Sequence, residues 1–232
     1  MKRRIRIQGF LIFLFLTLSV PLSKFLFQHW KQEILDKIFD AVGMGVVLFG
    51  FLFRISARGY KAENSLEGNN LVAEGPYSLV RNPMYFGTFL IGIGAITVLF
   101  NWWAFPLFFI IFLLIYIPQI HREEEALYRQ FGDKYMSYSK KIPKYFPHIH
   151  SFLKLDFIDY LPLKWRWIKK EFISLLAVIS VTIAIETWED VKFSGRAEYA
   201  KGLSELFFII IFYFVILFLL YAKRKPLNKT MS

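Results

Sequence analysis

The stretch GPYSLVRNPMY, residues 75–85, and the stretch HREEEALYRQFGDKY, residues 121–135, stand at the two ends of a long apolar part of the chain. Only Asn101 and Trp102 separate the apolar runs 84–100 and 103–120 between them. A membrane-spanning helix needs roughly 20 mostly apolar residues. The short link therefore predicts an antiparallel helical hairpin, which brings both polar stretches to the same side of a bilayer.

Working outward from this hairpin, the composition indicates an integral membrane protein. The 232 residues are 56% hydrophobic and 19% aromatic, with a mean hydropathy of +0.41, whereas soluble domains are about 45–50% apolar. The sequence predicts an all-α fold, a polytopic membrane helix bundle of about six transmembrane helices plus a cytoplasmic amphipathic helix. The six expected spans are Gly9–Phe27, Ile38–Ser56, Met84–Phe100, Trp103–Ile120, Phe172–Trp188 and Leu206–Ala222.

The positions of lysine and arginine predict how these helices are oriented. Basic residues concentrate before the first span, between the second and third, between the fourth and fifth, and after the sixth. Cytoplasmic loops carry such an excess. With six spans all four basic regions fall on one side, so both termini and both polar stretches are expected to be cytoplasmic. No small-residue cleavage site follows the first apolar run, which is expected to be a retained helix.

The segments outside the spans have their own patterns. The connection 57–74 contains Gly59, Gly68, Asn69 and Asn70, which predicts an irregular loop. From Glu123, apolar residues recur every four positions, which indicates an amphipathic cytoplasmic helix that ends by Ile142. Three regions are expected: 1–37 with the first helix, 38–147 as the core, and 148–232 as a C-terminal extension with two helices. Residues 163–171, with two tryptophans among basic residues, are interpreted as an interfacial belt.

The first polar stretch has the chemistry of a binding loop. Gly75-Pro76 and Asn82-Pro83 are rigid because proline fixes φ and restricts the residue before it. Pro83 also suits the first turn of a helix, whose free N–H groups favour an anionic partner. The alternative is a loop that only re-enters the membrane, with Arg81 setting topology. The glycines at 87, 92 and 94 allow close helix packing or the approach of a flat ligand, and packing is the preferred interpretation.

The second polar stretch offers three consecutive carboxylates, Glu123, Glu124 and Glu125. Successive residues of a helix are turned by about 100°, so at least one should face the bundle. Carboxylates at a membrane boundary are either solvated or functional. Arg122 beside them could pair with a carboxylate or bind one of a ligand. Arg54, near the end of the second span, is explained by snorkelling to the interface.

Several functional classes are excluded or disfavoured. The chain has no cysteine, which excludes disulfides and thiol chemistry. His148 and His150 are the only closely spaced histidines, and they are interpreted as part of a polar loop, so no metal site is expected. The net charge of +11 does not indicate nucleic acid, because the basic residues flank apolar segments and suit anionic lipids instead.

Taken together, the motifs resemble the isoprenylcysteine carboxyl methyltransferase and phospholipid methyltransferase superfamily. The resemblance covers about residues 43–147 and rests on GPYxxVRNPMY, the hairpin with its GxG, EExxLxxxFGxxYxxY and IPKYFP. It implies S-adenosylmethionine as methyl donor, bound at the cytoplasmic face, and a lipidic acceptor, either a prenylcysteine-like carboxylate or a phospholipid amine. Many isoprenylcysteine enzymes have histidine in place of Asn82, which bears on the substrate more than on the fold.

The resemblance also assigns residues. Those implied for the cofactor pocket are Tyr77, Arg81, Asn82, Pro83, Tyr85, Gly92, Gly94 and Glu124. Glu123 and Glu124 match the family's paired acids and, with Arg122, are the candidate catalytic residues. Their role stays open between charge complementarity to the sulfonium, hydrogen bonding to the cofactor, and general base.

Two other functions remain as alternatives. An NADPH-dependent membrane reductase of sterol-like lipids would share an RxPxY element, but the paired glutamates and FGxxY favour the methyltransferase. A transporter or other non-enzymatic membrane protein would be expected to carry midplane charges or broken helices. The hairpin 84–120 carries no such charge. The acceptor, the oligomeric state and the role of the last two helices are not predicted.

Overall fold

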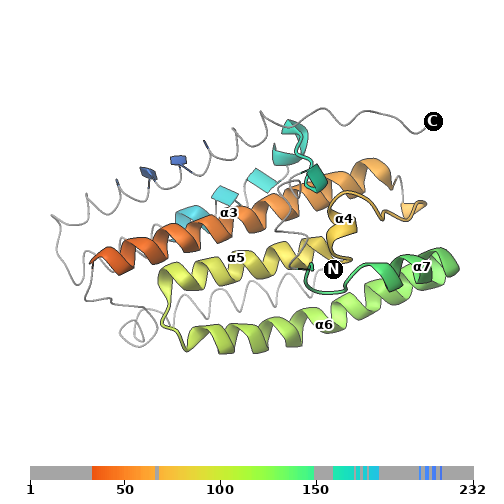
Figure 1. Ribbon diagram of the computed structural model, residues 1–232, viewed down its shortest axis with the longest axis horizontal. Coiled ribbons are helices and arrows are strands. Elements are labelled where there is room, and N and C mark those ends of the chain that lie inside the picture. The colour runs from red at the N-terminus through yellow and green to blue at the C-terminus, as the bar shows by residue number, and fades with distance from the viewer. Residues whose placement is uncertain are drawn as a thin grey trace.

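The computed structural model describes residues 33–65, 68–148, 159–169, 171–172, 175–176, 178–182, 204, 207–208, 211–212 and 215. Its ordered elements are all helices: α3 (Glu33–Asn64), α4 (Pro76–Leu79), α5 (Pro83–Leu99), α6 (Ala104–Phe131) and α7 (Asp133–Lys141). Figure 1 shows α3, α5 and α6 running side by side. The all-α class is thereby confirmed, and helices α3, α5 and α6 lie at the positions of the second, third and fourth predicted spans. The first predicted span lies outside the described residues, as do most of the sixth and much of the fifth.

Helices α3 and α5 pack antiparallel with their backbones in close contact. A Cβ built on Gly94 would lie 2.5 Å from the carbonyl oxygen of Gly43, and one on Gly87 would lie 2.6 Å from that of Gly50. These glycine pairs are seven residues apart on both helices, so they face each other along one line. Small residues permit such close packing of helices in a membrane. The glycines of this stripe thus serve packing.

Helices α5 and α6 form the predicted hairpin. Phe100, Asn101 and two residues in a turn connect them, and the ring of Phe108 lies where a Cβ on Gly92 would stand. Along most of its apolar length, however, α6 exposes large side chains; Leu114 is 71% exposed. By length and composition, Lys37–Asn64 and Ala104–Phe131 could cross a membrane, and α5 is a shorter apolar helix of 17 residues. An apolar face of this kind suits contact with lipid.

Two predicted boundaries were wrong. The segment 57–64 continues α3 as helix and only residues from Ser65 are irregular. Gly59 does not break the helix; instead the Trp167 ring lies 2.0 Å from where its Cβ would be. Likewise, α6 does not end near Ile120 but runs through Pro118 to Phe131. The predicted amphipathic helix is therefore the end of α6 followed by α7, and Gly132, at φ 51°, turns the chain between them.

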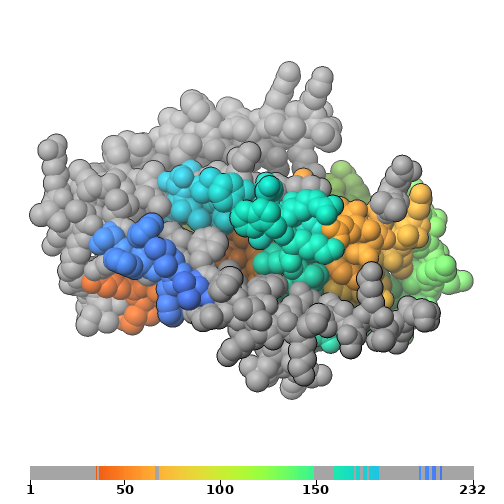
Figure 2. Space-filling view, turned by 90° about the horizontal axis from the view of Figure 1, so that it is seen from above, coloured from red at the N-terminus to blue at the C-terminus, as the bar shows by residue number. Residues whose placement is uncertain are grey.

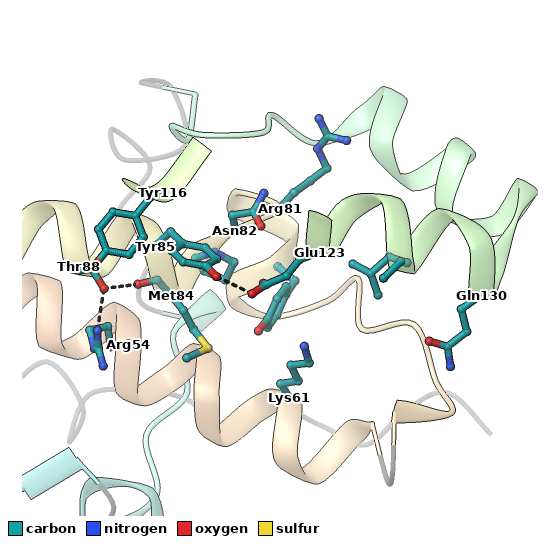
Figure 3. Close-up of a pocket in the computed structure, with 14 residues that line it drawn as sticks. Arg54, Lys61, Arg81, Asn82, Met84, Tyr85, Thr88, Tyr116, Glu123 and Gln130 are labelled. Atoms are coloured by element: carbon teal, nitrogen blue, oxygen red, sulfur yellow. Dashed lines mark hydrogen bonds between the residues drawn. The ribbon is translucent and has the colours of Figure 1, made fainter. Parts of the chain in front are cut away.

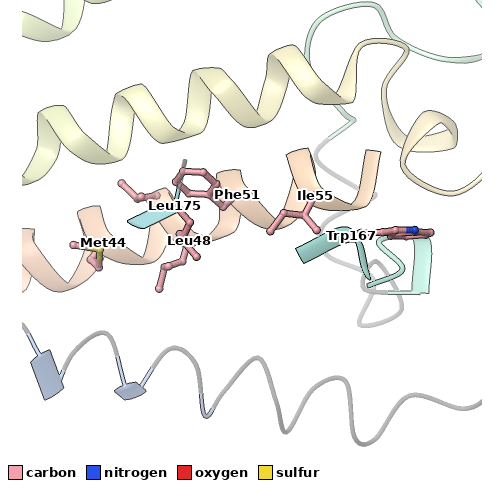
Figure 4. Packing of buried hydrophobic residues seen from close by; sticks show 7 residues of the cluster. Met44, Leu48, Phe51, Ile55, Trp167 and Leu175 are labelled. Atoms are coloured by element: carbon pink, nitrogen blue, oxygen red, sulfur yellow. The ribbon is translucent and has the colours of Figure 1, made fainter. Parts of the chain in front are cut away.

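Some of the described residues after Pro147 pack on α3. Trp167 and Leu175 join a buried cluster with Met44, Phe51 and Ile55 of α3 (Figure 4). The Trp167 indole donates a 2.8 Å hydrogen bond to Glu63, and Lys164 pairs with the same carboxylate. Trp167 is therefore a packing residue and not part of an interfacial belt, whereas Trp165 is exposed. In Figure 2, the teal and cyan residues of this segment lie on the surface between the two ends of α3.

Candidate active site

A pocket of about 630 Å³ lies where α3, α5 and α6 meet near the two polar stretches. Ligand pockets commonly have volumes of 300–1,000 Å³. The residues that line it are Arg54, Lys61, Tyr77, Arg81, Asn82, Pro83, Met84, Tyr85, Thr88, Tyr116, Glu123, Ala126, Leu127 and Gln130. Figure 3 shows side chains from all three helices converging on this space. A smaller pocket of about 130 Å³ adjoins it and shares Tyr77, Arg81 and Asn82.

The start of α5 is fixed by the segment that follows α7. The backbone N–H of Arg81 donates to the carbonyl of Pro143 at 2.9 Å, and the Asn82 amide donates to the carbonyl of Lys144 at 3.1 Å. Phe146 completes the contact with its ring against Phe86 and Phe89 of α5. The two proline-containing motifs, 82–83 and 142–147, are therefore parts of one structure. This explains why both are needed at the same end of the bundle.

Glu124 is the centre of a mostly buried polar cluster. Its side chain is 13% exposed and faces Arg81 at 3.5 Å, Lys144 at 2.9 Å and the Asn82 amide at 3.1 Å. Two cations and an amide around one carboxylate satisfy it and leave it little freedom to act on a ligand. Glu124 lines the smaller pocket, not the larger. Its observed interactions tie α6 to the start of α5 and to the segment after α7.

Glu123 lies in a different environment, although it is the adjacent residue. It is exposed and lines the larger pocket. The Tyr85 hydroxyl donates to its Oε1 at 2.5 Å (Figure 3). The Gln119 amide donates to the same oxygen at 2.9 Å. Both donors bind the same oxygen of Glu123. Its second carboxylate oxygen accepts no hydrogen bond from the residues that the structure describes. Glu123 therefore presents a fixed negative charge to the pocket.

Three tyrosines close the site on the side of α7. Burial, reinforced by the negative charge of Glu123, raises the pKa of Tyr77, and burial likewise raises the pKa of Tyr138. The Tyr138 hydroxyl donates to the carbonyl of Tyr77 at 2.7 Å. Burial and nearby Glu124 raise the pKa of Tyr135 to about 12, and its hydroxyl has no hydrogen-bond partner among the described residues. All three are neutral phenols at physiological pH.

Arg54 extends from α3 to the part of the pocket that Thr88 lines. Its Nη1 donates to the Thr88 hydroxyl at 2.7 Å, and its Nη2 lies 3.4 Å from Glu171. It does not snorkel to solvent as the sequence suggested, because these partners hold it against α5. Gly87 leaves space for this side chain, since a Cβ there would be 2.8 Å from Arg54 Cγ. Arg54 is 26% exposed.

The residues implied by the sequence motifs divide into two groups. Tyr77, Arg81, Asn82, Pro83, Tyr85 and Glu123 line the larger pocket together. Arg122 is exposed and lines neither pocket, and Gly92 and Gly94 lie against Phe108 and against α3. His148 is exposed, and His150 lies outside the described residues. Among the residues that the structure describes, no group of three potential ligands could hold a metal ion.

The sequence motifs missed several lining residues, namely Arg54, Lys61, Met84, Thr88, Tyr116, Ala126, Leu127 and Gln130. Arg54 and Lys61 belong to α3. They reach the pocket because the glycine pairs fix how α3 packs against α5, which sequence motifs do not show. Only Arg54 had a signal in the sequence, because a single arginine within an apolar helix is unusual. The others have residue types that occur throughout such helices and carry no signal of their own.

In comparison with known proteins, the chain matches methyltransferases. Residues 38–134 match the phospholipid methyltransferase family. The chain is 37% identical over 79 residues to protein-S-isoprenylcysteine O-methyltransferase of Schizosaccharomyces pombe, covering 34% of each protein. It is 32% identical over 122 residues to the protein of the same name from Xenopus laevis, covering 47% of this chain and 41% of that protein.

A third relative of that name, from Mus musculus, is 26% identical over 164 residues and 56% of each chain is covered. The chain thus spans about a third to a little over half of the length of these curated relatives. No solved structure matches. The matched region contains every residue that lines the larger pocket, which run from Arg54 to Gln130.

Proposed function

We propose that this chain is a member of the isoprenylcysteine carboxyl methyltransferase and phospholipid methyltransferase superfamily, a membrane methyltransferase that moves a methyl group from S-adenosylmethionine to a lipidic acceptor. The proposal rests on one observation: the region that matches the family, residues 38–134, is also the region that forms the pocket. The fourteen lining residues come from four helices and one loop, yet all lie between residues 38 and 134. The part of the chain that resembles methyltransferases is the part that forms the cavity.

The residues around the pocket fit the proposed cofactor. S-adenosylmethionine combines a cationic sulfonium, a carboxylate and an aromatic base, and it supplies an activated methyl group. Glu123 offers a negative charge, Arg81 and Lys61 offer cations, and Tyr85 and Tyr116 offer aromatic surface, their ring centroids 5.5 Å apart. We assign cofactor binding to Tyr77, Arg81, Asn82, Tyr85 and Glu123. Such a site contributes binding, alignment and electrostatics, because the donor already carries the activation.

The two acids have separate roles in this proposal. Glu123, fixed by Tyr85 and Gln119, faces the pocket and contacts cofactor or acceptor. Glu124 is a positioning residue that holds Arg81 and Asn82 in place. For a carboxylate acceptor no base is needed, whereas a protonated amine must first lose a proton. Glu123 is the carboxylate of the pair available for that transfer.

The setting of the site supports a membrane location and a lipidic acceptor. Apolar, outward-facing side chains along α6 support the proposal that one end of the pocket lies within the bilayer. We propose a multi-pass protein of about six spans with the pocket and both termini on the cytoplasmic side, following the basic loops. A water-soluble cofactor then enters from the cytoplasm and the acceptor from the lipid.

The experiment that tests the function measures binding and transfer separately. Full-length protein in detergent is titrated with S-adenosylmethionine and, in parallel, with NADPH; methyl-labelled donor is then incubated with extracted membrane lipids. We expect saturable S-adenosylmethionine binding and label in the lipid fraction. Glu123→Gln should weaken both, whereas Glu125→Gln, which alters the exposed pair with Arg129, should change neither. Binding of NADPH alone would indicate a reductase, and binding of neither ligand would contradict an enzymatic role.

A further inference from the structure

A buried carboxylate from outside the family region contacts a residue that lines the pocket. Glu171 follows the end of the family match at residue 134, and its side chain is 1% exposed. It pairs with Arg54, which lines the larger pocket, and with Arg58, which lines neither pocket. The family region supplies every residue that lines the larger pocket, but one of those residues is held by a later part of the chain.

The Arg54 guanidinium is held at two of its nitrogens. Its Nη1 donates to the Thr88 hydroxyl at 2.7 Å, and its Nη2 donates to Oε2 of Glu171 at 3.4 Å. The Thr88 hydroxyl donates in turn to the carbonyl of Met84 at 2.9 Å, so it acts as an acceptor toward Arg54 (Figure 3). A planar guanidinium with two such contacts has a defined orientation. That orientation depends on α5 and on the later segment together.

Glu171 also compensates the repulsion between two arginines. Arg54 and Arg58 are four residues apart on α3, so their side chains lie on the same face of the helix and repel each other. Glu171 directs one carboxylate oxygen to each of them. Without this negative charge, Arg54 would keep only the neutral Thr88 hydroxyl among its described partners, and Arg58 would push it from its position.

The position of Glu171 is fixed by packing and not by the arginines alone. Trp167, Glu171 and Leu175 recur at every fourth residue and are all buried, which places them on one face of a helical segment. Trp167 and Leu175 belong to the buried cluster on α3, and the Trp167 ring occupies the space at Gly59. The Trp167 indole also donates to Glu63. A carboxylate anchored on both sides in this way can hold a neighbouring side chain in place.

We propose that Glu171 is a positioning residue for methyl transfer, and that it acts through Arg54 by holding the guanidinium at its place in the pocket wall. The inference rests on the proposed function. Glu171 itself lines neither pocket, so it contacts neither cofactor nor acceptor in this proposal. The segment that carries it is then part of the catalytic unit, although it lies outside the family match.

The test compares two carboxylates that anchor the same segment. Glu171→Gln alters the one that contacts Arg54, whereas Glu63→Gln alters the one that binds Lys164 and Trp167 and lines neither pocket. For full-length protein in detergent, we measure apparent Tm, S-adenosylmethionine affinity and the maximal rate of label transfer to extracted membrane lipids. Both variants should have a lower Tm and unchanged cofactor affinity. Only Glu171→Gln should lose about tenfold or more in rate, because small displacements of pocket groups are costly for transfer.

The outcomes separate this inference from the proposed function. Equal transfer rates in Glu171→Gln and Glu63→Gln would overturn the inference alone, because a merely structural ion pair predicts the same loss from both. Weaker S-adenosylmethionine binding in Glu171→Gln would also overturn it, since the damage would then extend to the cofactor residues. Absence of both cofactor binding and transfer in the wild type would contradict the proposed function, and the inference with it.

A second substitution at Arg58 tests the charge compensation directly. Arg58→Gln alone should keep the wild-type rate, because Arg58 lines neither pocket and Glu171 still pairs with Arg54. Added to Glu171→Gln, it removes the repulsion of Arg54 and should restore part of the lost transfer rate. A role in stability alone predicts that the double variant is slower than Glu171→Gln or the same, and either result would contradict the proposed mechanism.

Glu171→Asp decides if Glu171→Gln does not fold. Aspartate keeps the charge but withdraws the carboxylate by about one carbon–carbon bond, about 1.5 Å, from an Arg54 nitrogen that is already 3.4 Å away. Arg58, whose side chain is 52% exposed, has the freedom to follow the shorter side chain. We expect a folded protein with a reduced transfer rate and unchanged S-adenosylmethionine affinity. A wild-type rate in this variant would overturn the inference.

Discussion

At the scale of single residues, the site depends on two adjacent glutamates with opposite surroundings. Glu124 is enclosed by Arg81, Lys144 and Asn82, whereas Glu123 faces the pocket. About 100° of helical rotation separates them, and that rotation is enough to put one carboxylate inside the protein and one in the cavity. The sequence predicted that at least one would point toward the bundle. Which one it would be depends on the position of Lys144, which no local pattern reveals.

Glu124→Gln should lower the stability of the protein. The substitution removes the charge that compensates Arg81 and Lys144, both mostly buried, and should cost about 2 kcal/mol. Thermal unfolding in detergent measures this as a drop of about 4–8 °C in apparent Tm. The matched control is Glu125→Gln, whose pair with Arg129 is exposed and should matter little. Equal Tm values for the two variants would show that the Glu124 cluster is not stabilising.

Tyr135 makes the stability sensitive to alkaline pH. Its pKa is raised from 10.0 to about 12, so folding favours the neutral phenol. This contribution is complete below pH 10 and is lost as pH rises from 10 through about 12. Tyr135→Phe, which also removes a buried hydroxyl without a partner, should therefore flatten the fall of apparent Tm over that range. Tyr77 and Tyr138 would keep part of the slope, and an unchanged slope in the variant would contradict the prediction.

At the scale of elements, the hairpin was predictable and the partner of α5 was not. Two apolar runs joined by Asn101 and Trp102 admit few arrangements, and the structure has the expected one. The register between α3 and α5, in contrast, arises from Gly43 and Gly50 facing Gly94 and Gly87. Sequence analysis found the stripe on α5 but not its counterpart on α3. Consequently it could not place Arg54 beside Thr88.

Alanine at Gly87 and at Gly94 should have different consequences for function. Each new Cβ meets a backbone carbonyl of α3 at 2.6 or 2.5 Å, so both variants should lose about 1–3 kcal/mol of stability. Only Gly87→Ala also contacts the Arg54 side chain. We expect Gly87→Ala to weaken methyl transfer more than Gly94→Ala does, because Arg54 lines the pocket. Unfolding measurements and methyl-transfer assays on both variants check this, and an equal loss of transfer in both would mean that the spacing of the helices, not the position of Arg54, determines the effect.

At the scale of the whole molecule, the family region forms the pocket and a later segment packs on α3. The family-matched residues form the cavity, and the described residues among 159–182 pack on α3 through Trp167 and Leu175. Single-sequence patterns suggested an interfacial belt there, because aromatic and basic residues alternate in both situations. What makes Trp167 a packing residue here is Gly59, because the absence of a side chain at Gly59 leaves space for the Trp167 ring. A glycine in a helix and a tryptophan more than a hundred residues later can be paired only in three dimensions.

The orientation of the hairpin in the membrane can be tested because the chain has no cysteine. Single cysteines replace Ser65, between α3 and α4, and Trp102, which is 78% exposed at the turn between α5 and α6. Helix α5 spans about 25 Å, close to the thickness of the hydrocarbon layer. The two sites should therefore lie on opposite sides, with Trp102→Cys labelled by an impermeant maleimide in intact cells and Ser65→Cys only after permeabilisation. Labelling of both from outside would contradict a spanning hairpin, and the reversed pattern would place the pocket on the outer face, where S-adenosylmethionine is not supplied by the cytoplasm.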